Sequence, residues 1–368
     1  ESKKNRLIAE ARTLRALYYF NLVRFFGDVP LILDLKTVED SKGPRDSKEL
    51  IYDQIIEDLT FAEEHLPLRS EYSASDEGRI NKGAAKILFG KVYLTKGDFQ
   101  KAKDKLAEVV EHESEYGFGL HKDYHANWLR DTEAGIEAVL YIEYKEPPFQ
   151  HNGEMALAGP KYSIPGSLGI SALNEADIPT QELYDQFDNR DLRKKTNFKT
   201  EFAHLKTGEI LKSSIPLSGK FWVEGLETGD RCDVNMHIIR YADAILMYAE
   251  ALNEVGESTK ALAMLNRIRE RAFGDDSGNF KPMSKDEFRT AILNERRLEF
   301  PHEGHRWFDL VRTGTFIQRM KEHSAYEAKV AEANKTEIAQ NIKEHMILMP
   351  IPQSEIDLNP NLVQNAGY

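Results

Sequence analysis

The sequence has little cysteine, no long apolar run and no excess of basic residues, and each shortage excludes a class of protein. Its 368 residues include one cysteine, Cys232, so no intramolecular disulfide can form. No run of about 18 apolar residues is present, so we expect no membrane-spanning helix. The formal net charge of −12 argues against a protein that binds the phosphate backbone of nucleic acid, which requires a basic face.

The sequence also lacks a secretory leader. Glu1 is not an initiator methionine, and no charged and then apolar segment follows it. We therefore expect the sequence to begin inside a longer precursor, without the signal peptide or any lipid-bearing cysteine of that precursor. With 41% hydrophobic residues the chain can bury a sizeable core.

Two stretches carry the same helix-turn-helix pattern, separated by a long segment without repeats. In each, small and large apolar residues recur at the spacing at which two antiparallel helices nest, with Gly97 or Gly256 at the turn. The matching residues are Phe89, Gly90, Tyr93, Ala102, Leu106 and Val109 in the first stretch and Tyr248, Ala249, Leu252, Ala261, Leu265 and Ile268 in the second. Such tetratricopeptide-type pairs are usually scaffolds for recognition.

Helical periodicity extends over most of the chain on both sides of that segment. Apolar residues at three- and four-residue steps predict a helix over 5–26, which ends before Pro30. Ser47 can cap a second helix that runs to about Leu66. Further helices are expected at 80–112, 236–256, 257–273, 285–300, 304–313 and 321–343.

The segment 113–235 has a different pattern. Residues 137–144 alternate like a strand, and the residues that follow are rich in Pro and Gly, which is typical of loops. Aromatic residues within these loops argue against disorder. We therefore expect one mostly α-helical domain over 1–368, in which a helical-repeat scaffold (1–112 and 236–368) carries an irregular, partly β specificity insert (about 113–235).

Five stretches, in this order, resemble the SusD/RagB family of outer-membrane nutrient-binding lipoproteins. They are residues 10–33 (EARTLRALYYFNLVRFFGDVPLIL), 83–97, 240–256 (RYADAILMYAEALNEVG), 292–313 (ILNERRLEFPHEGHRWFDLVRT) and 348–368 (LMPIPQSEIDLNPNLVQNAGY). The match covers nearly the whole chain and is weakest in the insert, as expected if the insert holds the specificity. Family members typically begin with a further N-terminal segment and a lipidated cysteine, and this sequence departs from the family there.

The resemblance implies both a fold and a function. The implied fold is a superhelix of tetratricopeptide-like helix pairs, packed against an irregular subdomain that binds an oligosaccharide or polysaccharide. The implied partner is a SusC-type TonB-dependent outer-membrane transporter, to which the protein delivers its ligand. The implied location is the cell outer membrane, as a surface-exposed lipoprotein that contacts the membrane only through a lipid anchor missing from this chain. No cofactor, nucleic acid or catalytic activity is expected.

Aromatic residues in the loops of the insert are the candidate ligand contacts. Trp222 follows Phe221 in a loop, and an apolar ring face can stack on the C–H face of a sugar. Trp222 could instead only fill the core of the insert. The other candidates are Phe149, His151, Asn152 and Tyr162, of which His151 and Asn152 could hydrogen-bond to sugar hydroxyls.

No complete metal or nucleophile motif is present. The histidine pairs His121 with His125 and His302 with His305 lack the third ligand that a zinc signature needs. Residues 166–169 (GSLG) are one residue short of a nucleophile elbow. The charged motif at 294–300 (NERRLEF) is predicted to form an amphipathic helix, with Glu295, Arg296 and Arg306 in a partly buried network of ion pairs.

Two other functions stay open at this point. A tetratricopeptide-type adaptor would bind a protein or peptide in a helical groove. A hydrolase would cut the polymers that the glycan-binding protein only holds, using two carboxylates at a set separation. The chain has 61 acidic residues, so a suitable pair could occur by chance and does not discriminate between these hypotheses.

Overall fold

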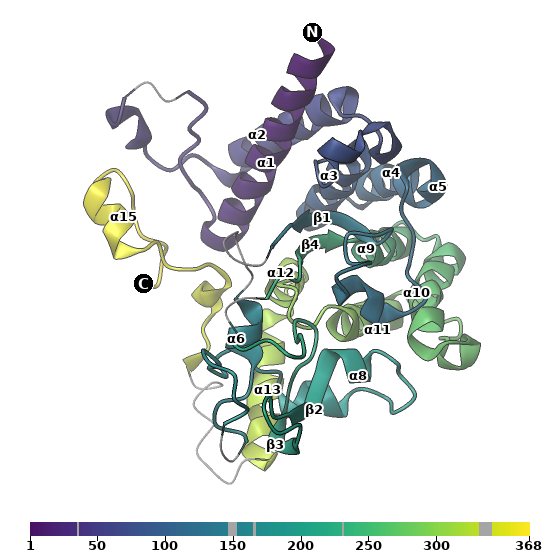
Figure 1. Cartoon of the computed structure of the whole chain (residues 1–368). Helices are drawn as coiled ribbons and strands as arrows, with labels where there is room; N and C mark the ends of the chain where they lie inside the picture. Colours follow the sequence, from purple (N-terminus) through teal and green to yellow (C-terminus); the bar gives the residue numbers. More distant parts are fainter. Residues whose placement is uncertain (35–36, 146–152, 165–166, 230–231, 331–340) are drawn as a thin grey trace. The chain divides into compact units, whose positions relative to one another are not determined.

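A computed structural model describes residues 1–34, 37–145, 153–164, 167–229, 232–330 and 341–368. They form two compact units. Unit 1 comprises Glu1–Tyr72, Arg79–Lys96 and Trp307–Tyr368, and unit 2 comprises Ser73–Gly78 and Gly97–Arg306. Helices dominate both units, which confirms the mostly α fold class (Figure 1). The borders of the units differ from the predicted borders of scaffold and insert, and that division stays a prediction.

Unit 1 is built from helices of both ends of the chain. They are α1 (Ser2–Phe26), α2 (Lys48–His65), α3 (Lys82–Lys96), α12 (Arg306–Arg312, which begins at the last residue of unit 2), α13 (Phe316–Val330) and α15 (Gln353–Leu358). The predicted first two helices are confirmed, and the Ser47 hydroxyl caps α2 by accepting from the Leu50 N–H at 3.3 Å. The helix predicted at 321–343 begins earlier, at Phe316, and its residues 331–340 lie outside the described part of the chain.

Helices α1, α2 and α3 pack closely through small side chains. Ala9 of α1, Ala62 of α2 and Ala85 of α3 are fully buried in one cluster. An ion pair also fixes α1 against α2. Arg15 of α1 donates from Nε and Nη2 to the two carboxylate oxygens of Asp58 of α2, at 2.7 and 2.6 Å. Asp58 is fully buried, so its charge requires this bidentate partner.

Unit 2 holds the remaining helices and the described strands. Its helices are α4 (Phe99–Val110), α5 (Glu113–Tyr116), α6 (Glu154–Ala158), α7 (Gln181–Asp185), α8 (Lys194–Asn197), α9 (Tyr241–Glu254), α10 (Ser258–Phe273) and α11 (Lys285–Glu299). Helices α9 and α10 pack against each other as the predicted helix pair (Figure 1). Both predicted turn glycines adopt the left-handed backbone that favours glycine, with φ of 78° at Gly97 and 89° at Gly256.

Two small antiparallel sheets interrupt the helices of unit 2. Strand β1 (Ala138–Ile142), which was predicted, pairs with β4 (Met236–Arg240), and Ala138 lies opposite Arg240. The prediction of helix from 236 was therefore wrong for its first five residues, because pairing with a strand almost a hundred residues earlier overrides the local pattern. The second sheet, β2 (Phe198–Ala203) with β3 (Ile210–Ser218), was not predicted.

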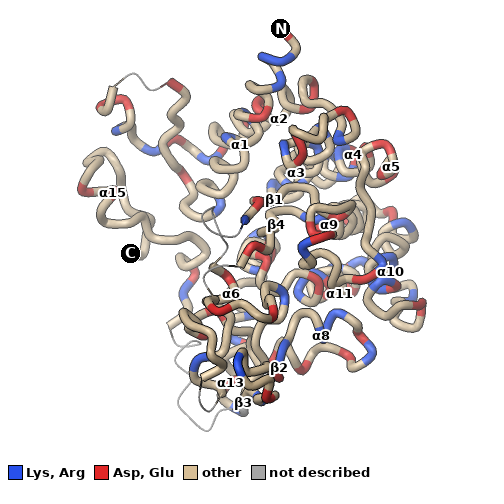
Figure 2. Tube along the Cα trace, in the orientation of Figure 1, with Lys and Arg blue, Asp and Glu red and all other residues tan. Residues whose placement is uncertain are grey.

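Acidic and basic residues are intermixed along the traces of both units (Figure 2). One group of charges lies inside unit 2. At its centre is Glu299, the last residue of α11, which is fully buried. Its carboxylate accepts from Arg193 at 2.9 Å, Arg240 at 3.0 Å and Arg271 at 2.6 Å. These arginines come from the segment before α8, from β4 and from α10, so Glu299 joins four separate parts of the unit.

Further carboxylates complete this buried charge cluster. Glu137 accepts from Arg240 at 2.5 Å and from Arg271 at 3.1 Å. Glu303 accepts from Arg240 at 2.7 Å and from the Lys220 ammonium at 2.5 Å. The predicted network is confirmed for Glu295, which pairs with Arg193 and Arg269, and for Arg296, which pairs with Asp243. Arg306 donates to the Leu293 carbonyl at 3.3 Å.

The cluster shifts the titration of its members. Burial alone would raise the pKa of Glu299, but Arg271, Arg240 and Arg193 outweigh it and hold this pKa at about 2. Burial lowers the pKa of Lys220 to about 8 in spite of its pairing with Glu303. Glu299 is ionised in the folded protein at any pH above its depressed pKa. It therefore contributes stability that is present above about pH 4.5, its unfolded pKa, and is lost as the pH falls toward 2.

Replacing Glu299 with Gln should lower the free energy of unfolding at pH 7 by about 3 kcal/mol, because it leaves three buried arginines without their shared counter-charge. The loss of wild-type stability between pH 4.5 and 2 should also become shallower in this variant. Urea denaturation followed by circular dichroism at several pH values measures both effects.

The matched control is Asp188→Asn, which breaks the exposed pair of Asp188 with Arg190. This pair is solvated and screened, so the urea midpoint of the Asp188→Asn variant should match that of the wild type. An equal loss in the two variants would show that the buried cluster has no special role in stability.

Candidate functional site

The structure separates the predicted ligand contacts into three groups. Phe149, His151 and Asn152 lie outside the described residues. Phe221 is 3% exposed and packs in a core cluster with Tyr124, Trp128, Met155, Cys232 and Val234. This burial leaves no ring face of Phe221 open to a ligand, and the prediction that it contacts a ligand is corrected accordingly. Trp222 and Tyr162 keep part of their surface.

Trp222 is partly buried. Its ring meets Phe202 edge to face, with centroids 4.7 Å apart, and packs against two core clusters of unit 2. Its indole N–H has no hydrogen-bond partner among the described residues. The ammonium of Lys199 lies 5.9 Å from the ring centroid. Packing therefore accounts for much of this side chain, and only its remaining surface could meet a ligand.

Tyr162 lies in the segment 160–164, here called the Tyr162 loop. The residue is 75% exposed, more than any other aromatic residue of the described chain. The ammonium of the neighbouring Lys161 lies 5.1 Å from the ring centroid. Single exposed aromatic residues are common on protein surfaces, but a ring with this much free surface can stack on a ligand.

The Tyr162 loop is held by one carboxylate. Oε1 of Glu175 accepts from the Lys161 N–H at 2.9 Å, the Ser163 N–H at 2.8 Å and the Ser163 hydroxyl at 2.5 Å. These three bonds, here called the Glu175 clamp, fix the backbone on both sides of Tyr162. On its far side the loop is tied to β3, because the Ser214 N–H donates to the Ser163 carbonyl at 3.0 Å.

The segment that carries Glu175 is docked in turn on α6. The N–H groups of Asn174 and Ala176 donate to the carbonyls of Ala156 and Leu157 at 2.9 and 2.7 Å. The segment approaches Gly159 so closely that only glycine fits there, since a Cβ at Gly159 would lie 2.4 Å from the Leu173 side chain. Hydrogen bonds to α6 and close packing at Gly159 therefore hold Glu175 in place. The local sequence around Glu175 gives no indication of this role.

One core cluster supports both surface aromatic residues. It contains Ile164, Leu168, Leu173, Phe202 and Leu217, with Trp222 packed against it. Ile164 belongs to the Tyr162 loop, and Leu173 lies two residues before Glu175. The Tyr162 loop and Trp222 therefore rest on the same core cluster within unit 2.

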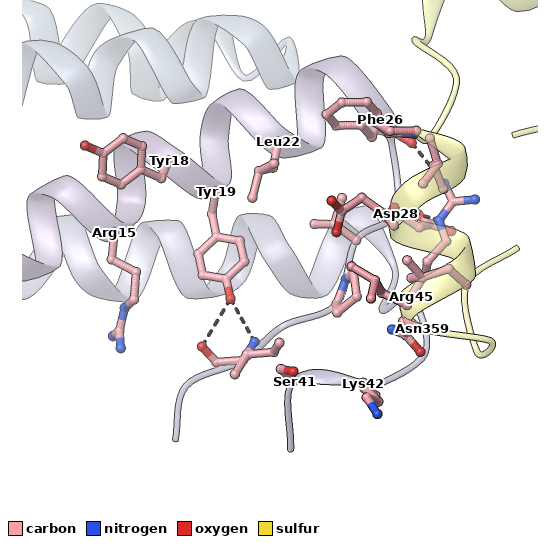
Figure 3. Close-up of a pocket in the computed structure, with 18 of the residues that line it drawn as sticks. Arg15, Tyr18, Tyr19, Leu22, Phe26, Asp28, Ser41, Lys42, Arg45 and Asn359 are labelled. Carbon is pink, nitrogen blue, oxygen red and sulfur yellow. Dashed lines mark hydrogen bonds between the residues drawn. The ribbon is translucent and has the colours of Figure 1, made fainter. Parts of the chain in front are cut away.

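A separate pocket of about 1070 Å³ lies in unit 1 (Figure 3). One wall is the outer face of α1, where Leu14, Tyr18 and Leu22 are 40%, 62% and 40% exposed. The other walls come from the chain after α1 and from the C-terminal segment at Ile351 and Leu362. The sequence pattern had marked the apolar residues of this face as part of the helical periodicity, but not as an exposed surface.

The polar groups around this pocket are largely committed to the protein itself. The Tyr19 hydroxyl donates to the Ile32 carbonyl at 3.2 Å and accepts from the Ile32 N–H at 2.8 Å (Figure 3). Arg45 donates to the carbonyls of Asp28, Phe26 and Val363 and to the side chain of Asn365. What the pocket offers is mainly apolar area, which suits an apolar group better than a sugar with many hydroxyls.

Within the described residues, three or more potential metal ligands never come together as a group. Of the two histidine pairs noted in the sequence, His302 bonds to Asp177 at 3.2 Å, and His121 lies against Gly135 with its Nε2 buried and without a hydrogen-bond partner among the described residues. In the same part of the chain we find no helix with the length and apolar character that a bilayer crossing requires.

Comparisons with known proteins agree with this fold. The sequence model of the SusD family matches residues 213–368, and one described as "starch-binding associating with outer membrane" matches residues 1–94. SusD-like protein P2 of Formosa agariphila is 31% identical over 407 residues, covering all of this chain and 75% of the relative. The starch-binding protein SusD of Bacteroides thetaiotaomicron is 31% identical over 427 residues, covering 98% of this chain and 72% of the relative.

The solved structure of a laminarin-binding SusD-like protein covers all of this chain, and the match spans 80% of that protein with 28% identity and a TM-score of 0.79. Sequence and structure therefore agree along the full length of the chain. The chain belongs to the SusD/RagB family.

Proposed function

We propose that this protein is a non-catalytic glycan-binding component of an outer-membrane nutrient-uptake system. It binds an oligosaccharide or polysaccharide at the Tyr162 loop, with Trp222 as a second contact. It then delivers this ligand to a SusC-type TonB-dependent transporter. The observation that carries the proposal is Tyr162, a 75% exposed ring on a loop that the Glu175 clamp holds in place.

The chemistry of sugars supports this assignment. A sugar ring presents an apolar C–H face that can stack on an aromatic ring while its hydroxyls stay hydrated at the edge. A held ring is a better platform than a mobile one, because less conformational freedom is lost on binding. The relatives named for binding starch and laminarin make a glycan the first ligand class to test here.

The outer-membrane location and the transporter partner rest on family membership. The description of the model that matches residues 1–94 supports association with the outer membrane. If the partnership holds, the protein should co-purify with a SusC-type transporter of the same cell. Adjacent genes for hydrolases of known linkage preference would also narrow the class of polymer.

One observation favours a second candidate, an adaptor that binds a helical peptide. The pocket of unit 1 exposes apolar side chains along α1, and Tyr18 among them is 62% exposed. An amphipathic helix could lie on such a face. The two candidates use different tyrosines, so single substitutions can separate them.

Replacing Tyr162 with Ala should weaken the binding of the cognate glycan about tenfold, which corresponds to about 1.4 kcal/mol of lost binding free energy. Isothermal titration calorimetry with malto-oligosaccharides and laminari-oligosaccharides measures this loss. Tyr18→Ala is the matched control, since it removes another largely exposed tyrosine ring, in the unit 1 pocket, and should leave glycan affinity unchanged. Loss of glycan binding in Tyr18→Ala alone would move the site to unit 1.

Replacing Trp222 with Ala should weaken glycan binding as well, and should lower the free energy of unfolding by about 2 kcal/mol because the ring is partly buried against Phe202. Trp222→Phe retains the edge contact and should restore most of the stability. Calorimetry and urea denaturation of both variants separate the two contributions. Full affinity in Trp222→Ala would leave the residue with a packing role only.

Incubation of the purified protein with starch or laminarin should release no reducing ends above the background of buffer alone. A colorimetric reducing-end assay over a day measures this, with a commercial amylase and a laminarinase as positive controls. Sustained release that disappears when a carboxylate is replaced by its amide would contradict the binding role and favour a hydrolase.

A further inference from the structure

The geometry points to Glu175 as the positioning residue of the glycan site: its carboxylate holds the Tyr162 loop in the conformation that presents the ring to the ligand. The inference rests on the proposed function and adds a residue that does not touch the ligand itself. It concerns unit 2 alone, in which both Glu175 and the Tyr162 loop lie.

The clamp concentrates three donors on one oxygen atom. The N–H groups of Lys161 and Ser163 flank Tyr162 in the chain, and the Ser163 hydroxyl adds a third bond, all within 2.9 Å of Oε1. Hydrogen bonds to an ionised acceptor are stronger than those between neutral groups. With the amide on each side fixed, rotation of the backbone around Tyr162 would break at least one of these bonds.

The ionisation of Glu175 fits this role. Burial would raise the pKa of its carboxyl, but the hydrogen bonds from Ser163 and from the backbone of the Tyr162 loop outweigh it and lower the pKa. The carboxylate is therefore charged in the folded protein at neutral pH, which is the state that accepts from three donors.

The backbone of Glu175 adopts an unusual conformation to reach the loop. Its φ is +54°, in the left-handed region that residues with a Cβ rarely occupy, and Ala172 on the same segment has a φ of +66°. Such strain persists only where surrounding contacts determine the conformation. Here those contacts are the bonds from Asn174 and Ala176 to the end of α6 on one side and the clamp on the other.

The consequence concerns affinity. A loop that is already ordered before binding does not lose further freedom when the sugar stacks on Tyr162. Without the clamp, the same ring would sample several positions, and the fraction in the binding conformation would reduce the apparent affinity in proportion. Glu175 thus acts on the ligand only through Tyr162.

The first test needs no ligand. In hydrogen–deuterium exchange followed by mass spectrometry, Glu175→Ala should speed exchange of the peptide that contains Lys161 and Ser163 at least tenfold. Glu175→Gln keeps an oxygen acceptor without the charge and should restore only part of the protection. Glu209→Ala, an exposed glutamate in the turn between β2 and β3, serves as control and should not change this peptide. Unchanged exchange in Glu175→Ala would overturn the clamp.

The second test uses maltoheptaose or laminarihexaose, whichever the wild type binds. Glu175→Ala should weaken its binding about as much as Tyr162→Ala, roughly tenfold, and Glu175→Gln should recover part of it. In the Tyr162→Ala background, Glu175→Ala should add less than about twofold, because the two residues act in series. Losses that multiply in the double variant would overturn the positioning role.

The results distinguish failure of the proposed glycan site from failure of the positioning role of Glu175. Faster exchange in Glu175→Ala together with full glycan affinity in Tyr162→Ala would uphold the clamp and overturn the proposed site. Reduced affinity in Tyr162→Ala together with unchanged affinity in Glu175→Ala would uphold the site and overturn the inference.

Discussion

The stability of unit 2 depends on pairing the charged side chains that become buried when it folds. Glu299 stands at the end of α11 with no access to water, and three arginines from distant parts of the sequence reach its carboxylate. Removing charges from water is costly, so each of these groups is stable in the interior only while the others are in place. The cluster therefore couples α10, α11, β4 and the segment before α8.

The same device occurs at the surface on a smaller scale. Glu299 gathers side-chain donors from separate elements, whereas Glu175 gathers backbone and hydroxyl donors from one short loop. In both cases a carboxylate satisfies several donors at once and converts a set of segments into one rigid group. The difference lies in the consequence: the buried cluster determines stability, and the surface clamp determines where an aromatic ring points.

The pocket of unit 1 and the Tyr162 loop differ in the kind of ligand that they can bind. The pocket of unit 1 offers apolar area, because groups such as the Tyr19 hydroxyl and the Arg45 guanidinium are already bonded within the protein. Tyr162 instead presents an aromatic ring next to open water, where a sugar can stack and keep its hydroxyls hydrated. A glycan-binding role is therefore better served by the Tyr162 loop, and the pocket suits an apolar partner.

The sequence by itself determined most of the long helices, the cap at Ser47, the turns at Gly97 and Gly256 and the strand at 137–144, because each follows from local spacing or local backbone preference. It indicated that Glu295 and Arg296 take part in ion pairs, whereas their partners Arg193, Arg269 and Asp243 come from distant parts of the chain. It also placed Tyr162 and Trp222 in loops. Only the tertiary structure decided that residues 236–240 form a strand, that Phe221 is buried while Tyr162 is exposed, and that the apolar face of α1 lines a pocket. It alone brought Glu175 to the Tyr162 loop. These features depend on contacts between residues far apart in the chain, or on which of two apolar faces finds a partner, and local periodicity carries no information about either.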